Sequence, residues 1–357
     1  MSVLPSVAVV ILNWNGRGFL EKFLPSVCQS TYGNLELYLA DNASTDDSVA
    51  FTQTHFPQVK IIRNPSNNGF AGGYNEALQH VQADIYVLLN QDVEVSPGWI
   101  EPVVALMQQD PQIAACQPKL RAYYQQDEFE YAGAAGGWMD ILGYTFCRGR
   151  ILYTTEKDEG QYDDVQDVFW ATGAALFIRS KCFHEVKGFD ADFFAHMEEV
   201  DLCWRLQRAG YRISYCPDSL VYHVGGGSLP QGNPRKLYLN FRNNLMMLWK
   251  NLHPFDRWIV LSQRFFLDVL AAVKSLVAGK PKDMTAIIRA YKDYHKWRRK
   301  YDLKQDHLPW KKLLDMHGVF HGIMIWRYYF LGRKEFSKLE HEKERATRNT
   351  ERGTPDA

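Results

Sequence analysis

Polar side chains suited to metal binding recur at a few positions in the first 234 residues. Asn90, Gln91 and Asp92 follow an apolar run at residues 85–89. A carboxylate with flanking amides at the end of a strand can bind a hard divalent cation together with diphosphate oxygens, although an isolated Asp there more often caps a turn. The segment is therefore a candidate metal site that needs support from elsewhere in the chain.

A second set of acids falls at the start of a predicted helix at residues 198–209. Glu198, Glu199 and Asp201 would lie in its first turn, where negative charge interacts favourably with the helix N-terminus. Asp201 is also placed to pair with Arg205 one turn later. The adjacent Glu198 and Glu199 follow two phenylalanines and a histidine, and they are more typical of a site for acid–base chemistry.

Two further segments have more than one interpretation. The acidic and hydroxyl side chains of residues 41–46 could hydrogen-bond a nucleobase or ribose, or could only cap the helix that follows. His223 precedes a run of glycines, and it could be a metal ligand or an ordinary histidine at the end of a strand.

The elements that would position these residues alternate between strands and helices. Apolar, β-branched-rich runs predict buried strands at residues 7–12, 35–40, 59–62 and 85–89. Such alternation predicts an α/β fold with a mostly parallel, Rossmann-like sheet flanked by helices. Ligands bind such sheets at the carboxyl ends of the strands. The polar residues at those ends are Asn13, Asn15, Asp41, Asn67 and Asp92.

The first strand and helix also imitate a dinucleotide-binding fingerprint. Gly16 and Gly18 follow the first strand, and Asp41 ends the second. Glu21 occupies the position that needs Gly or Ala for close helix–strand packing, so we do not expect NAD or FAD.

Composition places the chain among ordinary globular proteins. Of its 357 residues 46% are apolar and 23% are charged, which excludes a wholly disordered chain, a collagen-like repeat and a small disulfide scaffold. The six cysteines include no C-x-x-C pair, as is typical of buried thiols in a reducing compartment. No Lys or Arg precedes the first apolar run, so we expect no secretory signal and a cytoplasmic chain.

The formal net charge of zero conceals an uneven distribution. Residues 1–234 contain 15 Lys and Arg against 28 Asp and Glu, whereas residues 235–357 contain 26 against 13. An acidic front and a basic back indicate different partners. We expect a catalytic domain at residues 1–234, a helical basic region at 235–332 and a charged, largely disordered tail at 333–357.

The basic region contains the most apolar stretch of the chain, at residues 258–278. Arg264, Asp268 and Lys274 interrupt it, and a membrane-spanning helix tolerates such charges poorly. An amphipathic helix lying in the membrane interface fits better, with the cations of residues 291–300 against anionic headgroups. The alternative is a soluble helical cap. No recognition motif supports nucleic-acid binding, so we expect no nucleic acid as a partner.

Together and in this order, these segments resemble the inverting family 2 glycosyltransferases, which have the GT-A fold. The resemblance covers about residues 5–228, and the closest likeness is to bacterial rhamnosyltransferase-like members that build surface polysaccharides. The matching features are the opening strand and loop at 9–16, the D-N-A-S-T-D segment at 41–46, the N-N-G-F-A-G-G-Y-N loop at 67–75, Asn90-Gln91-Asp92 where the family has its D-x-D motif, the M-E-E-V-D-L-C-W-R segment at 197–205, and the later His223.

The resemblance implies a mechanism and a set of roles. A sugar would move, with inversion, from a nucleotide-diphosphate sugar to a saccharide or lipid-linked saccharide. Trp14 would stack on the base, and Asp41 would bind the base or ribose. Asp92 and His223 would hold Mg²⁺ or Mn²⁺. The enzyme would be peripheral on the cytoplasmic face of the membrane, in contact with its anionic surface.

Glu199 would be the general base, with the division of roles among Glu198, Glu199 and Asp201 left open. The resemblance further implies nucleotide-sugar contacts by Asn13, Asn15, Asn67, Asn75 and Asn90. Trp138 and Trp170 are candidates for stacking on the acceptor, and core packing is the commoner role for such residues.

Two departures from the family pattern keep alternatives open. Asn90 replaces the first Asp of the metal motif, and Glu199 stands where the family has Asp. The alternatives are a sugar-1-phosphate nucleotidyltransferase and a catalytically dead carbohydrate- or lipid-binding protein on the same scaffold. The first would need a Gly-rich basic loop after the first strand, where only Arg17 is present.

Overall fold

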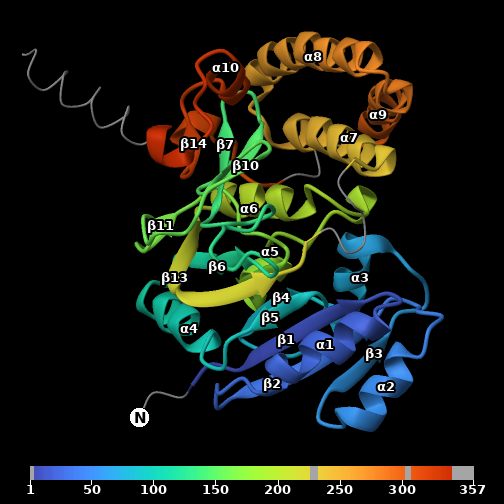
Figure 1. Cartoon of the computed structure of the whole chain (residues 1–357), viewed down its shortest axis with the longest axis vertical. Coiled ribbons are helices and arrows are strands. Elements are labelled where there is room, and N and C mark those ends of the chain that lie inside the picture. The colour runs from blue at the N-terminus through green and yellow to red at the C-terminus, as the bar shows by residue number, and fades with distance from the viewer. Residues whose placement is uncertain (1–3, 226–231, 302–306, 340–357) are drawn as a thin grey trace, which may run out of the picture.

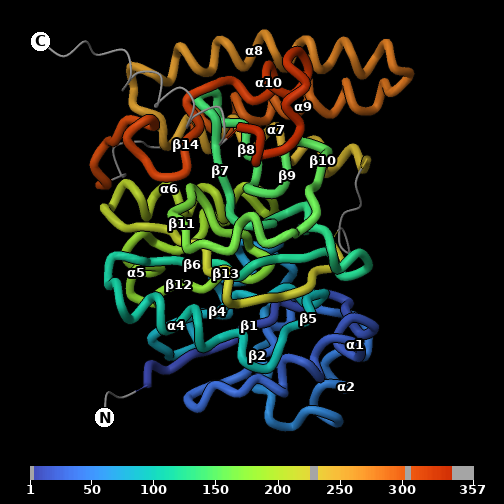
Figure 2. The backbone as a smooth tube through the Cα atoms, turned by 60° about the vertical axis from the view of Figure 1, so that its left-hand side comes forward, coloured from blue at the N-terminus to red at the C-terminus, as the bar shows by residue number. Residues whose placement is uncertain are grey.

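The computed structural model describes residues 4–225, 232–301 and 307–339. Its layers follow one another along the long axis, from the N-terminal sheet and its helices through a small second sheet to a group of long C-terminal helices (Figure 1). The same order is visible after rotation (Figure 2).

The N-terminal half of the main sheet is parallel, as the sequence predicts. Its strands, in spatial order, are β3 (Lys60–Arg63), β2 (Leu35–Asp41), β1 (Val7–Asn13) and β4 (Ile85–Asn90). The connecting helices are α1 (Arg17–Cys28), α2 (Ser48–His55) and α3 (Gly69–Ala77), with the 3₁₀ turn η1 (Leu78–His80). Because β1 and β2 pair with Asn13 opposite Asp41, two of the polar strand ends lie side by side.

The other half makes the sheet mixed, which corrects the expectation of a mostly parallel sheet. Strand β12 (Ala175–Arg179) runs antiparallel to both β4 and β6 (Ile113–Ala122). Strand β13 (Arg212–His223) is parallel to β6. The remaining members, β5 (Val93–Val95) and β11 (Gln166–Asp167), are antiparallel to β13. A strand that is buried on both faces is a continuous apolar run, whether it lies parallel or antiparallel to its neighbours. The sequence pattern therefore does not reveal the direction of the strand in the sheet.

A second, five-stranded sheet was not predicted. Its spatial order is β10 (Thr154–Thr155), β9 (Arg150–Ile151), β8 (Thr145–Cys147), β7 (Gly137–Asp140) and β14 (Val319–Phe320). Strands of two to four residues are too short to show an alternating pattern.

Helices dominate the C-terminal region, as predicted. They are α7 (Pro234–Asn251), α8 (Pro254–Val277), α9 (Pro281–Lys300) and α10 (Met324–Tyr329), with the 3₁₀ turn η4 (Leu313–Asp315). Each of the three long helices begins with a proline, whose fixed φ and missing N–H suit the first helical position. Strand β14 pairs with β7, so this region packs into the N-terminal part of the chain.

The expected disordered tail needs correction in its first part. Phe336 and Leu339 are buried, and the backbone N–H of Phe336 donates to Glu156 Oε1 at 2.7 Å. Phe336 also packs against Trp138, with ring centroids 5.1 Å apart. Residues 333–339 are thus docked on the second sheet, and residues 340–357 lie outside the described part of the chain.

The remaining helices are α4 (Ile100–Gln109), α5 (Ser180–Glu185), the 3₁₀ turn η2 (Ala191–Phe193) and α6 (Glu198–Arg208). Within the described ranges no helix combines the length and the apolar character needed to cross a bilayer. All six cysteines have free thiols, and five of them are buried.

Candidate active site

Asn13 at the end of β1 organises the loop that follows β2. Its Nδ2 donates to Asp41 Oδ1 at 3.1 Å, to Ser44 Oγ at 3.0 Å and to Ser48 Oγ at 2.8 Å. The side chain is fully buried. Asn13 therefore shapes the predicted nucleotide-binding segment from beneath instead of lying on its surface.

Asn15 fastens the same two loops together. It has a left-handed backbone (φ 51°), and its Oδ1 accepts from the backbone N–H of Thr45 at 2.7 Å and of Asp46 at 3.3 Å. Trp14, between the two asparagines, is 50% exposed. The asparagines thus hold a rigid platform from which the Trp14 ring projects with a face free for stacking.

Asn67 and Asn75 are engaged with the protein backbone. Asn67 Oδ1 accepts from the N–H of Gly69 at 3.0 Å, at the start of α3. Asn75 makes a reciprocal pair with Phe189, in which its Nδ2 donates at 2.7 Å and its Oδ1 accepts at 3.0 Å. Asn75 therefore holds the segment leading to α6, and these bonds occupy both ends of its amide.

The sheet brings Asp92 and His223 together across 131 positions of sequence, as expected. Strand β5 pairs with the end of β13, and His223 Nε2 lies 3.2 Å from Asp92 Oδ1. Asn90 Nδ2 lies 3.4 Å from the same nitrogen. Both members of the Asp92–His223 pair are buried.

Glu130 is a third member that the sequence analysis missed. Its Oε1 lies 3.2 Å from His223 Nδ1, on the opposite side of the ring from Asp92. Burial lowers the pKa of His223, but the charges of Glu130 and Asp92 outweigh it and raise the pKa to about 10. Burial raises the pKa of Asp92, yet the nearby His223 brings it below its usual value. No motif marks Glu130, since it lies in an irregular segment far from His223 in sequence.

This donor set fits a divalent cation in its chemistry. A metal-binding histidine commonly presents one ring nitrogen to the metal while a carboxylate holds the other, as Glu130 does here. Nε2 faces Asp92 and Asn90, which would offer oxygen ligands. Among the described residues, no three or more His, Cys, Asp or Glu side chains form a group that could hold a metal, so Asp92 and His223 would bind an ion only together with other ligands, such as diphosphate oxygens.

The N-terminus of α6 separates the three predicted acids into two environments. Asp201 is fully buried and accepts from Arg205 at 2.8 Å, Asn251 at 2.8 Å and Lys250 at 3.1 Å. The predicted Asp201–Arg205 pair is confirmed. Burial raises the pKa of Asp201, but Lys250 and Arg205 bring it below its usual value, and the carboxylate has a structural position.

Glu198 and Glu199 have no such partners. One carboxyl oxygen of each, Oε2, is buried without a hydrogen bond. Burial raises the pKa of Glu199 to about 7. Burial and the neighbouring Glu199 raise the pKa of Glu198 well above its usual value. A buried carboxylate that titrates near neutral pH has the properties of a general base.

An unusual backbone turn lies directly before these glutamates and positions them. Phe194, His196 and Met197 all have positive φ (65°, 71° and 72°), a conformation that costs energy for residues other than glycine. Asn243 on α7 spans the turn, and its Nδ2 donates to the carbonyls of Phe193 at 3.0 Å, Ala195 at 2.8 Å and His196 at 2.7 Å. Sequence analysis missed Asn243, which stands alone in a helical segment.

Helix α3 holds the other side of this turn. The backbone N–H of Phe70 donates to the carbonyl of Phe194 at 2.7 Å. A side chain on Gly69 (φ 70°) would collide with that carbonyl, since an added Cβ would stand 2.4 Å from its oxygen. The glycine in the 67–75 loop therefore permits the approach of α3 to the turn.

The two tryptophans suggested for acceptor binding lie elsewhere. Trp170 is 4% exposed, and its Nε1 donates to the carbonyl of Trp138 at 3.1 Å. The prediction that Trp170 stacks on an acceptor sugar is therefore wrong, because the ring is enclosed in the core. Trp138 is partly buried on β7 against Phe336.

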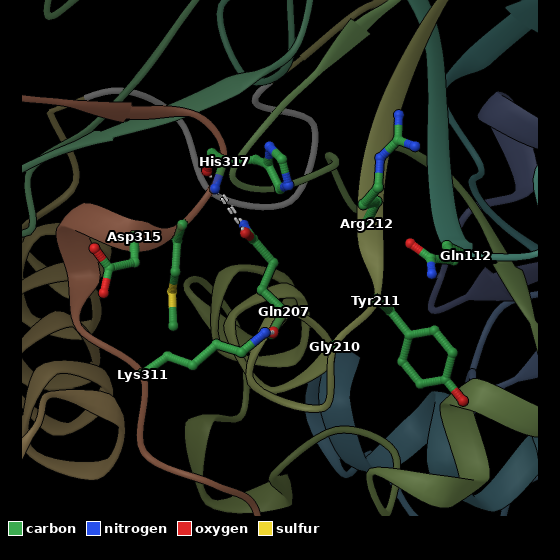
Figure 3. A pocket seen from close by; sticks show the side chains of 9 residues that line it. Gln112, Gln207, Gly210, Tyr211, Arg212, Lys311, Asp315 and His317 are labelled. Atoms are coloured by element: carbon green, nitrogen blue, oxygen red, sulfur yellow. Dashed lines mark hydrogen bonds between the residues drawn. The ribbon is translucent and has the colours of Figure 1, made fainter.

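None of these residues lines the small polar cavity of about 110 Å³ that Figure 3 shows. Gln207 and Arg212 line it, and the backbone N–H of His317 donates to Gln207 Oε1 at 3.0 Å. Ligand sites for molecules of drug size usually exceed 300 Å³, so this cavity is too small for a nucleotide sugar.

Comparison with known proteins agrees with this arrangement. The sequence model described as Glycosyl transferase family 2 matches residues 8–181. The chain is 29% identical over 239 residues to an N-acetylglucosaminyl-diphospho-decaprenol L-rhamnosyltransferase of Mycobacterium tuberculosis, covering 62% of this chain and 76% of that protein. A pre-mycofactocin glycosyltransferase of the same species is 26% identical over 61% of this chain and 42% of its own length.

Solved structures show the same fold at low sequence identity. GalNAc-T7, crystallised with UDP, GalNAc and Mn²⁺, superposes with a TM-score of 0.58 at 16% identity, over 87% of this chain and 59% of that one. Residues 1–349 of S. aureus TarS with UDP-GlcNAc superpose with a TM-score of 0.52 at 14% identity, over 80% of this chain and 81% of that one. The chain has the GT-A glycosyltransferase fold.

Proposed function

We propose that this chain is a glycosyltransferase that transfers a sugar with inversion from a nucleotide-diphosphate sugar to a lipid-linked saccharide, because residues 8–181 match the Glycosyl transferase family 2 model and the chain is similar to an N-acetylglucosaminyl-diphospho-decaprenol L-rhamnosyltransferase. The observation that carries the proposal is the pair Glu198 and Glu199. Glu198 is buried and Glu199 partly buried, one oxygen of each is enclosed without a hydrogen bond, and both are held at the end of a strained turn. Unsatisfied acids of this kind are expensive in a folded protein and are typical of a catalytic site.

The nucleotide would lie over the ends of β1 and β2. Trp14 is exposed and can stack on the base, while Asp41 lies beneath the loop that would face the base and ribose. In support, the structures of GalNAc-T7 and TarS are described with UDP and UDP-GlcNAc, respectively. Asn13 and Asn15 would act by fixing the shape of this platform.

Asp92 and His223 would hold Mn²⁺ or Mg²⁺, with Asn90 beside them and Glu130 orienting the imidazole. When bound, the ion would neutralise negative charge on the leaving diphosphate. GalNAc-T7, with the same fold, is described with Mn²⁺. The replacement of Asp by Asn at position 90 leaves one carboxylate and one imidazole as the strong protein ligands.

Glu199 would accept the proton of the acceptor hydroxyl as that oxygen attacks the anomeric carbon. Its pKa of about 7 allows a useful fraction to be ionised at neutral pH. Burial and the neighbouring Glu199 raise the pKa of Glu198 well above its usual value, which favours the protonated form of that carboxyl beside the base. Asp201 would take no part in the chemistry, since its oxygens are bonded to α6 and α7.

The relatives and the charge distribution support a proposed acceptor and location. The mycobacterial relative is named for a decaprenol-linked acceptor, and residues 235–357 carry twice as many basic as acidic residues. We therefore place the enzyme on the cytoplasmic face of the membrane as a peripheral protein.

The test begins with a thermal-shift screen of UDP-, GDP- and dTDP-sugars with and without Mn²⁺. The stabilising donor is then used to measure its hydrolysis and its transfer to a polyprenyl-diphosphate saccharide. Glu199→Gln should lower the rate by about 10²-fold or more while donor binding persists. Asp92→Ala should remove the metal-dependent part of nucleotide binding. If no nucleotide sugar is bound or hydrolysed, the proposed activity is wrong.

A further inference from the structure

Helix α8 turns its charged stripe toward the protein. Arg264 and Asp268 are 3% and 1% exposed. Arg264 Nη1 donates to Asn244 Oδ1 on α7 at 2.6 Å, and Tyr291 on α9 donates its hydroxyl to Asp268 at 2.8 Å. Two of the three charges that interrupt the apolar stretch, Arg264 and Asp268, are thus paired within the protein.

The opposite face of α8 is apolar and exposed along its length. Phe266 and Leu270, one turn apart, are 68% and 64% exposed, and Trp258, Val273 and Val277 lie on the same outward side. Soluble monomeric proteins rarely expose continuous apolar surface of this extent. Because Arg264 and Asp268 face inward, the exposed polar residues on the outward side of α8 are few: Ser262 and Gln263 one turn before Phe266, and Lys274 one turn after Leu270.

Helix α10 extends the apolar surface. Trp326 and Phe330 are exposed and stack on each other with centroids 4.3 Å apart. Lys274 near the end of α8 lies 4.7 Å from the ring centroid of Tyr329, which joins the two helices. Both occupy the end of the molecule opposite β2 and α2 in the two views (Figures 1 and 2). We refer to the outward residues of α8 and α10 as the apolar end face.

The charge around this face identifies its occupant. Leaving aside the buried Arg257, Arg264 and Asp268, residues 254–300 contain nine Lys and Arg against three Asp, a net charge of +6, and Lys274, Lys280 and Lys282 are exposed. Two copies of the chain joined through this face would bring two such cationic surfaces together. An anionic lipid surface would instead neutralise the cations while covering the apolar side chains.

We propose that the apolar end face inserts into the headgroup and upper acyl layer of an anionic bilayer, with α8 lying in the plane of the membrane. The inference rests on the proposed function in one respect, since it assigns a surface to the membrane location proposed for the enzyme. It places the main sheet, and with it the nucleotide platform, on the side of the molecule away from the lipid. Insertion of apolar residues beside bound cations makes attachment only partly sensitive to salt.

The test is flotation of the full chain with vesicles of phosphatidylcholine alone and with phosphatidylglycerol added, at low and high salt. The variant is Phe266→Glu combined with Leu270→Glu. Because both side chains are exposed, the double change should leave the melting temperature and donor hydrolysis without vesicles unaltered. The matched control is Val165→Glu, an exposed aliphatic residue between β10 and β11.

Wild type and Val165→Glu should float with the anionic vesicles, and a fraction should remain bound at high salt. The double variant should lose vesicle binding by about tenfold or more. If the double variant floats like wild type, the apolar end face is not the membrane surface. If wild type is a dimer in solution and the double variant a monomer, with no flotation of either, the face is an interface between copies. Donor hydrolysis without vesicles reports separately on the proposed activity.

Discussion

Asn243 on α7 donates its side-chain amide to the backbone carbonyl of His196 at 2.7 Å, two residues before the glutamate pair of the candidate active site. His196 and Met197 both have left-handed backbones. The next residue on α7, Asn244, accepts from Arg264 of α8. Helix α7 therefore connects the turn that presents Glu199 with the helix that carries the apolar end face.

Asn243 should act as a positioning residue. Asn243→Leu should lower kcat by about 10–100-fold with little change in donor affinity, since a small displacement of Glu199 is costly to the rate. Asn240→Leu on the same helix serves as the control. Steady-state kinetics on both variants, with the pH profile of kcat, separates displacement of the base from general unfolding. Equal kinetics for the two variants would contradict the assignment.

The raised pKa of Glu199 predicts opposite effects of pH on rate and stability. The rate should increase as pH rises through about 7, because the ionised form accepts the proton. The folded pKa lies above the unfolded value of 4.5, so the native state binds more protons between these values and loses stability as pH rises through that window.

Glu199→Gln should remove this loss. The variant should gain about 1–3 kcal/mol in the free energy of unfolding relative to wild type between pH 5 and pH 8, although it is inactive. Denaturant unfolding at both pH values provides the measurement. A constant difference between the two proteins would show that Glu199 titrates normally.

Glu130→Gln should weaken metal binding without removing a ligand. The amide retains the shape of the side chain but not the charge that holds His223 Nδ1 at 3.2 Å. We expect the affinity for Mn²⁺ in the presence of nucleoside diphosphate to fall by about 10–100-fold, the usual effect of losing such an orienting carboxylate. Calorimetric titration would measure it, with Glu128→Gln as the control, and unchanged affinity would count against the site.

Asp201→Asn should affect stability first. The substitution leaves the buried Lys250 and Arg205 with less compensating charge, and breaking a buried pair of this kind costs about 3–5 kcal/mol. Asp293→Asn removes a partly exposed partner of Arg289 and Lys296 and should cost less than about 1 kcal/mol. If the Asp201→Asn protein folds with normal stability but lacks activity, Asp201 must again be considered a catalytic residue.

The sequence by itself determined the features that depend on local pattern. Buried apolar runs predicted β1, β2 and β4, and the polar residues that end them, Asn13, Asp41 and Asp92, lie where a parallel sheet requires. The three acids followed by Arg205 predicted the start of α6. The spacing of apolar residues and the residue types at helix ends depend on only a few neighbouring positions. They can therefore be recognised in the sequence without knowing the fold.

Only the tertiary structure decided which isolated polar residues meet. Glu130 contacts His223, and Asn243 bonds to the carbonyl of His196. The members of each pair are far apart in the sequence, and no local sequence pattern connects them. The same holds for α8, where the sequence showed a charged stripe but not whether it faces solvent or the protein. Its burial against Asn244 and Tyr291 depends on how α7 and α9 pack beside it, and that packing leaves the apolar side outward.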